Sequence, residues 1–426
     1  EFRRVLFRSC TLNLFSGVFN NGMIKYENDR DGFLSSMQGL VSTLTLCMLL
    51  LYLLFFKKLS LWIEISRVLI IVMFMEILAN SAFSFWSAKQ RFEFKYRNMV
   101  ILTLVVSVLS PLVAAVSVIN TPDKFGADVR IISSACIVIV FYGIIYIINY
   151  IKGKNFFSKK YWIYALKFNI PLVPHYLSTL ILSQSDRIMI SKMIGMAEAG
   201  IYGLSHNLAM ILNILTTSIN NAFAPWIYQR LKEEKYRDIS SVCNKLFLFV
   251  AVALAFMMAF SPEVISILAP SEYYDAVYVI PPLAISLYFM FMYQIFANVE
   301  FYFEKNKFIM LASIFSAGFN VFLNYIFIKK LGYIAAGYTT LVCYVILGIS
   351  HYIFSDKVAK KCIKDNIHLF DIKIVIGISC ILMIFGLIML LLYKNLLLRY
   401  GLILIMCMIF FIKRKDIYKF IVSIRR

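Results

Sequence analysis

The chain has 426 residues, of which 61% are hydrophobic and 15% are charged. Soluble globular proteins carry about 25% charged and 45–50% apolar residues, so this composition excludes an ordinary soluble enzyme and a disordered protein. The formal net charge of +20 would suggest a nucleic-acid partner in a soluble protein. In a membrane protein the same excess is typical of cytoplasmic loops beside anionic lipid, so its position along the chain decides its meaning.

Apolar stretches long enough to cross a bilayer recur along the whole chain. A transmembrane helix needs roughly 20 apolar residues, and this criterion predicts an all-α polytopic membrane protein with about twelve visible spans. The connections between them are too short for a soluble domain. The predicted spans are residues 34–56, 64–88, 98–119, 129–151, 164–190, 199–225, 240–269, 277–303, 308–328, 333–354, 374–393 and 396–412.

Lysines and arginines are distributed unevenly between alternate loops. One set of loops, together with the C-terminal tail, holds 28 of them, whereas the opposite set holds 9. Because cytoplasmic loops are enriched in Lys and Arg, the first set is predicted to face the cytoplasm. The segment before the first complete span and the C-terminus would then both lie inside, which requires an even number of spans.

The N-terminal segment and an internal repeat carry further information. Residues 1–9 fit poorly with the rest of the chain, and we expect them to be a non-native leader. A faint repeat links residues 79–83 (Ala-Asn-Ser-Ala-Phe) with residues 297–301 (Ala-Asn-Val-Glu-Phe), near the ends of the second and eighth spans. Since these spans run in the same direction, the pattern favours two halves related by an axis along the membrane normal, as in parallel-repeat transporters.

Motifs of soluble enzymes are absent from the sequence, which holds no P-loop, no dinucleotide-binding glycine pattern and no His-Glu-x-x-His. The cysteines are scattered and form no Cys-x-x-Cys, so buried packing thiols are expected rather than a metal site. Asp29-Arg30-Asp31 matches an Asp-x-Asp motif by chance, because no nucleotide fold surrounds it. We therefore expect no enzymatic activity, no metal and no cofactor.

Polar side chains inside the predicted spans are the candidate functional groups. A charged side chain at mid-bilayer costs about 2.5–3.5 kcal/mol on insertion scales, so it is expected to face a cavity or a partner. On the fifth span His175, Thr179, Leu182 and Asp186 share one helical face, with Arg187 adjacent. The sixth span adds a stripe of His206, Met210, Asn213, Thr217 and Asn220, and the ninth adds Ser313, Ser316, Asn320 and Asn324. The second span contains Glu76, and the eighth contains Gln294, Asn298 and Glu300.

Two kinds of role remain open for these side chains. The guanidinium of Arg187 suits phosphate oxygens, and Glu76, Asp186 and Glu300 are candidate ion-coupling groups. Structural roles compete with each assignment. Asparagine and serine stripes also serve as hydrogen bonds between helices, Asp186 and Arg187 could form a structural charge pair, and a glutamate near an interface can snorkel or cap a helix.

Several segments resemble a known transporter family. Residues 168–175 read Phe-Asn-Ile-Pro-Leu-Val-Pro-His and residues 185–190 read Ser-Asp-Arg-Ile-Met-Ile. Together with the other segments, they resemble the polysaccharide transporter family of oligosaccharide (O-antigen, capsule) flippases, Wzx-type, within the MOP superfamily. In chain order the matching segments are residues 15–33, 168–175, 185–190, 199–203, 222–226 and 270–282.

The resemblance implies a fold of two six-helix lobes around a central cavity, with two appended helices and 14 helices in the intact protein. Residues 10–156 would form the N-terminal lobe without its first two helices, and residues 157–356 the second lobe. Residues 357–426 would supply the appended pair and a basic cytoplasmic tail. The cavity residues implied are Arg187, His175, His206, Asn213, Asn220, Asn298, Asn320 and Asn324.

The activity implied by the resemblance is translocation of undecaprenyl-diphosphate-linked oligosaccharide units from the inner to the outer leaflet, for surface polysaccharide such as O-antigen, lipopolysaccharide, capsule or exopolysaccharide. The location would be the bacterial cytoplasmic membrane, with the C-terminus in the cytoplasm. The expected partners are the lipid-linked glycan, membrane lipid, and polysaccharide polymerase and chain-length proteins. No nucleic-acid partner is expected, and the family favours a monomer.

Rival functions share parts of this pattern. An ion-coupled multidrug or toxin exporter of the same superfamily would favour acidic cavity residues, and Glu76, Asp186 and Glu300 against Arg187 leave that alternative open. A lipid II flippase would usually carry several cavity arginines, of which few are found. A membrane glycosyltransferase or polysaccharide polymerase would need a sizeable outer loop for its chemistry, and the predicted outer loops are short.

Overall fold

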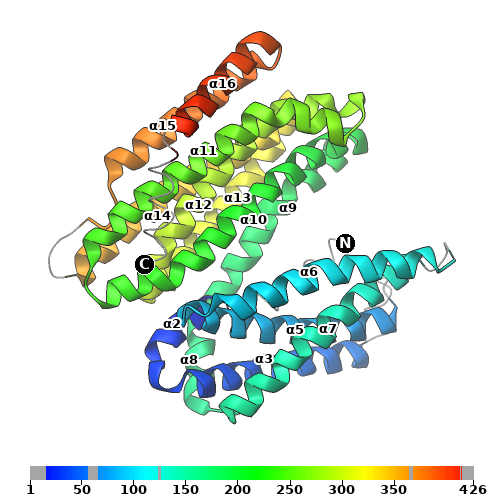
Figure 1. Ribbon diagram of the computed structural model, residues 1–426, viewed down its shortest axis with the longest axis vertical. Coiled ribbons are helices and arrows are strands. Elements are labelled where there is room, and N and C mark those ends of the chain that lie inside the picture. The colour runs from blue at the N-terminus through cyan, green and yellow to red at the C-terminus, as the bar shows by residue number, and fades with distance from the viewer. Residues whose placement is uncertain (1–15, 56–65, 123–125, 364–367, 413, 415–426) are drawn as a thin grey trace. The chain divides into compact units, whose positions relative to one another are not determined.

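The computed structural model describes residues 16–412 and residue 414, except residues 56–65, 123–125 and 364–367. The expected leader at residues 1–9 and most of the basic C-terminal tail lie outside the described residues. Every regular element of the described part is helical (Figure 1). In chain order these are α2 (Ser16–Lys25), η1 (Glu27–Asp29), α3 (Arg30–Leu54), α5 (Arg67–Phe92), α6 (Tyr96–Ile119), α7 (Gly126–Gly153), α8 (Lys159–Asn169), η3 (Ile170–Leu172), α9 (Val173–Met193), α10 (Met196–Lys232), α11 (Tyr236–Leu268), η4 (Ser271–Val279), α12 (Ile280–Tyr302), α13 (Asn306–Leu331), α14 (Ile334–Cys362), α15 (Ile372–Leu392) and α16 (Leu396–Ile412).

The prediction of an all-α polytopic membrane protein is confirmed. Within the described part, nine helical segments are long and apolar enough to cross a membrane, and each coincides with a predicted span. The other three predicted spans are helical too: residues 164–190 lie in α8, η3 and α9, residues 199–225 in α10, and residues 396–412 in α16. Polar side chains interrupt the apolar runs of α9 and α10, and α16 has 17 residues.

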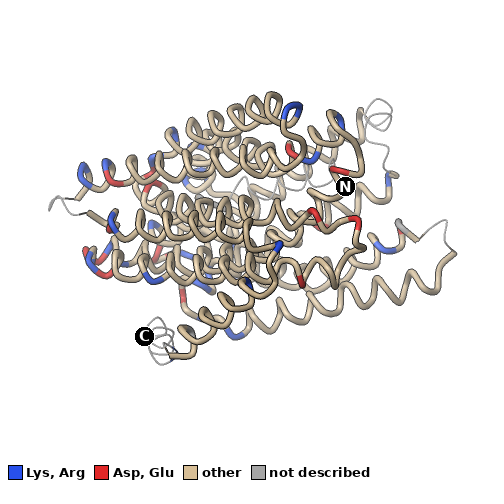
Figure 2. Tube along the Cα trace, turned by 90° about the horizontal axis from the view of Figure 1, so that it is seen from above, with Lys and Arg blue, Asp and Glu red and all other residues tan. Residues whose placement is uncertain are grey.

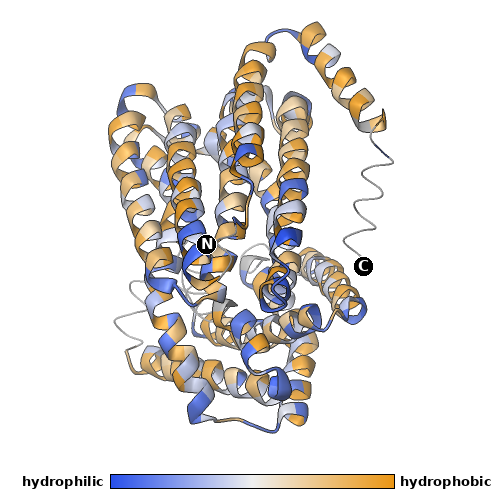
Figure 3. Cartoon of the chain, turned by 90° about the vertical axis from the view of Figure 1, so that its left-hand side faces the viewer, coloured by the Kyte–Doolittle hydropathy of each residue, from blue (hydrophilic) through white to orange (hydrophobic). Residues whose placement is uncertain are grey.

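Apolar side chains on the helix surfaces match a lipid environment. On α6, Leu104, Val108, Leu112 and Val116 recur every fourth residue, so they share one helical face. Each of these side chains is more than half exposed, and a stripe of this kind is stable only against lipid or another apolar surface. Figure 2 shows Lys and Arg concentrated toward helix ends and turns, and in Figure 3 hydrophobic residues cover most of the helix lengths.

Contacts divide the chain into two compact units. The first comprises Glu1–Leu180, Ala222–Glu233 and Asn298–Ile314. The second comprises Ile181–Asn221, Glu234–Ala297 and Phe315–Arg426. The division passes through α9, α10, α12 and α13, so each of these helices contributes residues to both units.

In the first unit α7 packs against α3, α5 and α6. The rings of Phe83 and Tyr142 stack with centroids 4.1 Å apart, and they join α5 to α7. Two buried polar side chains of this core, Gln38 and Asn149, are hydrogen-bonded to each other. Gln38 on α3 donates to the backbone carbonyl of Tyr146 at 2.9 Å and accepts from the amide of Asn149 at 2.9 Å.

The short helices of the first unit carry a polar cluster that connects distant parts of the chain. Glu304, which follows α12, accepts a hydrogen bond from the hydroxyl of Tyr164 on α8 at 3.0 Å. Its carboxylate also lies 3.5 Å from Nζ of Lys25, the last residue of α2. Lys232, at the end of α10, pairs with Glu27 of η1. Polar contacts therefore join Glu304 to α8 and to the end of α2, and they join the end of α10 to η1.

In the second unit α11 packs against α15 and η4. Phe247 of α11 makes edge-on ring contacts with Tyr288, Phe291 and Phe296 of α12. Arg399 on α16 forms an ion pair with Glu263 on α11, and its side chain is 3% exposed. The aromatic contacts join α12 to α11, and the ion pair joins α16 to α11.

Candidate functional site

The carboxylate of Asp186 is the centre of a buried polar network in the second unit. Asp186 lies on α9 and is 2% exposed. Its Oδ2 accepts hydrogen bonds from the hydroxyl of Tyr202 on α10 at 2.6 Å and from the hydroxyl of Thr340 on α14 at 2.8 Å. Its Oδ1 accepts from the amide of Asn324 on α13 at 2.6 Å. Four helices thus converge on one carboxylate.

A second layer of hydrogen bonds extends this network. The amide of Asn320 donates to the hydroxyl of Thr340 at 3.0 Å, and its oxygen accepts from Asn324 at 3.1 Å and from Ser185 at 3.1 Å. Thr339 donates to the side-chain oxygen of Asn324. Asn320 and Asn324 are one helical turn apart on α13, which explains why both amides reach the same side.

The arrangement around Asp186 defines what its carboxylate can do. Burying an ionised carboxylate is costly unless hydrogen bonds compensate it, and here all three direct partners are neutral donors. A carboxylate in such surroundings is suited to exchange a proton, and its neighbouring amide and hydroxyl oxygens are suited to a small cation. The geometry therefore fits an ion-coupling group.

Arg187 has different partners from its neighbour Asp186. Its Nη2 lies 3.3 Å from the backbone oxygen of Gly203, 2.9 Å from Nδ1 of His206 and 2.6 Å from Oδ1 of Asn207, all on α10. Because a guanidinium only donates, Nδ1 of His206 is the acceptor. The hydrogen bonds of these two adjacent charges therefore go to separate groups.

Donors of the Arg187 guanidinium remain available. Its Nε is buried and has no hydrogen-bond partner among the described residues. Its Nη1 makes no hydrogen bond in the same part of the chain, since the three contacts of the side chain all use Nη2. The side chain is half-buried. A partly desolvated guanidinium with unused donors is suited to an anionic oxygen ligand such as phosphate.

Four other predicted site residues belong to the first unit. His175 is 7% exposed, and its Nδ1 lies 2.6 Å from the hydroxyl of Ser313. Asn298 and Glu300, near the end of α12, are 5% and 0% exposed, and Glu76 on α5 is 6% exposed. All four side chains are buried, as intramembrane polar groups are expected to be. The candidate residues therefore form two groups, one in each unit.

The remaining asparagine candidates on α10 are more exposed. The side chain of Asn213 contacts its own helix, with Met210 Sδ at 3.6 Å and the Thr217 hydroxyl at 3.5 Å. Asn220 is half-buried on the same helix. The contacts of Asn213 lie within α10, whereas Asn320 and Asn324 are at the centre of the network around Asp186.

Sequence reasoning missed several residues of these clusters. Tyr202, Thr339, Thr340 and Asn207 all contact the predicted residues. Tyr202 precedes His206 by four residues, so helical periodicity could have added it to the stripe on α10. The threonine pair has no such signal, because hydroxyls are common in membrane helices and only the packing of α14 brings Thr340 to Asp186 and Thr339 to Asn324.

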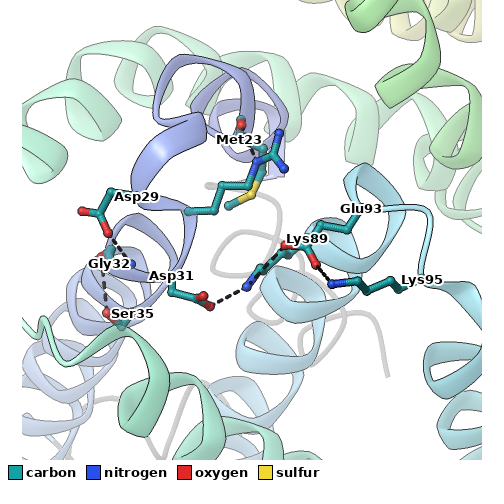
Figure 4. Close-up of polar contacts among 9 residues, drawn as sticks. Met23, Asp29, Asp31, Gly32, Ser35, Lys89, Glu93 and Lys95 are labelled. Atoms are coloured by element: carbon teal, nitrogen blue, oxygen red, sulfur yellow. Dashed lines mark hydrogen bonds and ion pairs between the residues drawn. The ribbon is translucent and has the colours of Figure 1, made fainter.

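The Asp-x-Asp motif lies in the first unit and is shown in Figure 4. Asp29 caps α3 by accepting from the backbone N–H of Gly32 at 3.1 Å, and it accepts the hydroxyl of Tyr161 at 2.6 Å. Asp31 pairs with Lys89 of α5 at 2.5 Å. The two carboxylates therefore have separate structural partners.

Two family models match the chain. The model of polysaccharide biosynthesis proteins matches residues 20–227. The MatE model matches residues 171–326, so the two overlap across α9 and most of α10. The overlap contains Asp186, Arg187 and the turn of α10 that contacts both side chains.

Individual proteins resemble the chain in sequence or in fold. A protein of the Lsg locus of Haemophilus influenzae is 28% identical over 177 residues, which are 39% of this chain and 44% of that protein. The chain spans about half the length of the curated relatives it matches. Among solved structures, an outward-facing multidrug resistance MATE transporter of the MOP superfamily has a TM-score of 0.70, with 14% identity over 85% of this chain and 86% of that one. The lipid II flippase MurJ, in an inward closed conformation, has a TM-score of 0.59, with 16% identity over 99% and 92%.

Proposed function

We propose that the chain is a membrane transporter of the MOP superfamily that flips undecaprenyl-diphosphate-linked oligosaccharide units from the inner to the outer leaflet of a bacterial cytoplasmic membrane. The observation that carries this proposal is the pair of neighbouring charges on α9. Asp186 is held in a buried network of neutral donors, and Arg187 keeps unused donors on a half-buried guanidinium. The match to the polysaccharide biosynthesis model supports the glycan substrate.

The chemistry of the lipid-linked substrate explains the role of Arg187. A diphosphate with a sugar cannot cross hydrocarbon unaided, so a carrier must provide a polar cavity that opens to each side of the membrane in turn. Arg187 would bind the diphosphate, with His206 and Asn207 orienting its guanidinium. The polyprenyl tail would stay in the lipid during transport.

In this mechanism Asp186 is the ion-coupling residue. Its carboxylate would gain and lose a proton or a small cation, and each change would alter the hydrogen bonds that join α9 to α10, α13 and α14. Glu76 and Glu300 remain further coupling candidates in the first unit. The asparagines Asn213, Asn220 and Asn298 and the imidazole of His175 would contact sugar hydroxyls.

The surroundings of the protein complete the proposal. The basic loops and the C-terminus would face the cytoplasm, and the lobes would comprise residues 10–156 and 157–356, with residues 357–426 appended. Released glycan would pass to a polysaccharide polymerase and chain-length proteins on the outer face, and the carrier would act as a monomer.

Export of drugs or toxins is a second candidate function. The MatE model match and the TM-score of 0.70 to a MATE transporter favour it. The two functions predict opposite preferences at Arg187. A lipid diphosphate needs its positive charge, whereas a cationic drug would bind no worse, or better, after Arg187→Ala.

Complementation tests the proposal. The protein is expressed in a bacterial strain that lacks its own oligosaccharide flippase, and surface glycan is measured by blotting. We expect rescue by the wild type, partial rescue by Arg187→Lys and loss of rescue by Arg187→Ala at equal membrane levels. Arg130→Ala, which removes an exposed arginine of α7, is the matched control. Full rescue by Arg187→Ala, or drug resistance without surface glycan, would reject the flippase assignment.

A further inference from the structure

One turn of α10 contacts both neighbouring charges on α9. Tyr202 at the start of this turn donates its hydroxyl to Asp186 Oδ2 at 2.6 Å. Gly203, His206 and Asn207, on the same turn and the next, supply the three acceptors of Arg187 Nη2. The segment from residue 202 to residue 207 is therefore held by the carboxylate through Tyr202 and by the guanidinium through Gly203, His206 and Asn207.

Tyr202 is the residue of this turn whose hydrogen bond depends directly on the charge of Asp186. Its side chain is fully buried, so its hydroxyl has no access to water as an alternative partner. A hydrogen bond to an ionised carboxylate is roughly twice as strong as one to a neutral group. Any change in the charge of Asp186 therefore changes how firmly Tyr202, and with it this turn of α10, is held to α9.

The other donors to Asp186 lack this connection. Thr340 donates to the same oxygen, Oδ2, but it lies on α14, which makes no hydrogen bond to Arg187. Asn324 donates to Oδ1 from α13. Ser205 lies on the α10 turn and is fully buried, yet its hydroxyl bonds the backbone oxygen of Ala276 at 2.8 Å rather than Asp186. These residues provide natural controls.

We propose that Tyr202 is a positioning residue that couples the ion-binding group Asp186 to the anion-binding group Arg187 by holding the α10 turn that supplies the acceptors of the guanidinium. This inference rests on the proposed function, because it assigns a role to one residue within the same site. It predicts an energetic coupling between the two charges that depends on a single phenolic hydroxyl. Such a coupling is typically worth a factor of about five or more in affinity.

A double-mutant cycle tests the coupling. Binding of farnesyl diphosphate, with farnesol as the uncharged control ligand, is measured by titration calorimetry on the purified protein in lipid nanodiscs. The quantity compared is a ratio of two Kd values for farnesyl diphosphate. It is the Kd measured with Asp186→Asn added, divided by the Kd of the same protein without that substitution. Removing the negative charge also favours an anion directly, but this electrostatic effect is present in every background and cancels in the comparison.

We expect the ratio to change by about fivefold when the cycle is repeated with Tyr202→Phe. Phenylalanine keeps the buried ring and removes the hydroxyl alone. The same cycle with Thr340→Val, which removes a donor to the same oxygen, and with Ser205→Ala, which removes a hydroxyl from the same turn, should leave the ratio within about twofold of wild type.

Two results would overturn the inference, and they are distinguishable from failure of the proposed function. An unchanged ratio with Tyr202→Phe, or an equal change with Thr340→Val, would show that the hydroxyl of Tyr202 has no special role, even though Arg187→Ala weakens binding. If Arg187→Ala leaves farnesyl diphosphate binding unchanged, the anion site itself is wrong, and the positioning role of Tyr202 is rejected with it.

Discussion

The side-chain amide of Asn324 donates to the carboxylate of Asp186 across 2.6 Å, although 138 residues separate them in sequence. Both side chains are almost completely buried, at 0% and 2% exposure. The contact joins α13 to α9 and fixes the orientation of the carboxylate toward Tyr202 and Thr340. Since a buried acceptor that loses its donor costs free energy, the consequences of removing this amide can be predicted.

Asn324→Ala should lower the free energy of unfolding by about 2 kcal/mol, because Oδ1 of Asp186 and the side-chain oxygen of Asn320 both lose this amide as a donor. Thermal unfolding in detergent measures the effect as a fall in Tm. Asn213→Ala, on α10, removes an amide with contacts only on its own helix and should change the free energy by less than about 0.5 kcal/mol. Equal Tm values for the two variants would contradict the importance assigned to the network.

Gly39 on α3 lies against the backbone that follows α7. A Cβ at this position would come within 2.0 Å of the backbone oxygen of Phe156, which is not free to move as a side-chain end would be. Gly39→Ala is therefore expected to destabilise the protein by about 2 kcal/mol through overpacking. Gly143→Ala, within α7, meets no atom within 4 Å and should stabilise the helix by about 0.5–1 kcal/mol. Opposite shifts in Tm would support the close approach of α3 to this segment, and parallel shifts would reject it.

The ion pair of Arg399 and Glu263 can be tested by removing one partner or both. The arginine side chain is 3% exposed and the glutamate 28%, and the hydroxyl of Tyr400 also donates to Glu263 at 2.7 Å. Arg399→Met should cost about 3 kcal/mol, because it leaves a partly buried carboxylate without its cation. The double variant Arg399→Met, Glu263→Leu should recover most of that loss. Urea or thermal unfolding of the three proteins measures this, and additive losses would show that the pair contributes no coupling.

Tyr161 on α8 donates its hydroxyl to Asp29, and burial together with this hydrogen bond raises the pKa of Tyr161 to about 12. An ordinary tyrosine titrates near pH 10, so the stabilisation from this group is fully present below about pH 10 and is lost as the pH rises toward 12. Tyr161→Phe should therefore lower the free energy of unfolding by about 1 kcal/mol, with no pH dependence between pH 6 and 9.

The control for Tyr161 is Tyr325→Phe, which removes the hydroxyl of a tyrosine that is 58% exposed on α13. Its ring remains available to Lys329, whose Nζ lies 4.3 Å from the ring centroid. The Tm of this variant should match the wild type. A loss for Tyr161→Phe that varied across pH 6–9 would mean that a group other than this phenol responds to pH at the start of α3.

The fold could be predicted from the sequence because lipid imposes a simple rule. A helix that crosses a bilayer must present about 20 apolar residues, so the spans are visible as runs, and nine of them coincide with helices that satisfy the same criterion in the structure. The stripe of Asn320 and Asn324 was also predictable, since a spacing of four places both amides on one face of α13.

The partners of Asp186 could not be predicted in the same way. Tyr202, Asn324 and Thr340 lie on three different helices, and their convergence depends on how α10, α13 and α14 pack around α9. Sequence periodicity shows which residues share one face of a helix, but it does not show which other helix packs against that face. For the same reason, Asp186 and Arg187 were considered as a pair, whereas the helix directs their side chains to different partners.

Pro225 weakens the backbone hydrogen bonding inside α10. It stands inside the helix, just after the point where α10 passes from the second unit to the first. A proline has no backbone N–H, so the carbonyl of Asn221 loses its usual helical partner, and the ring crowds the preceding turn. The turn of α10 that precedes Pro225 is therefore held by one backbone hydrogen bond fewer than an uninterrupted helical turn, and it resists bending less.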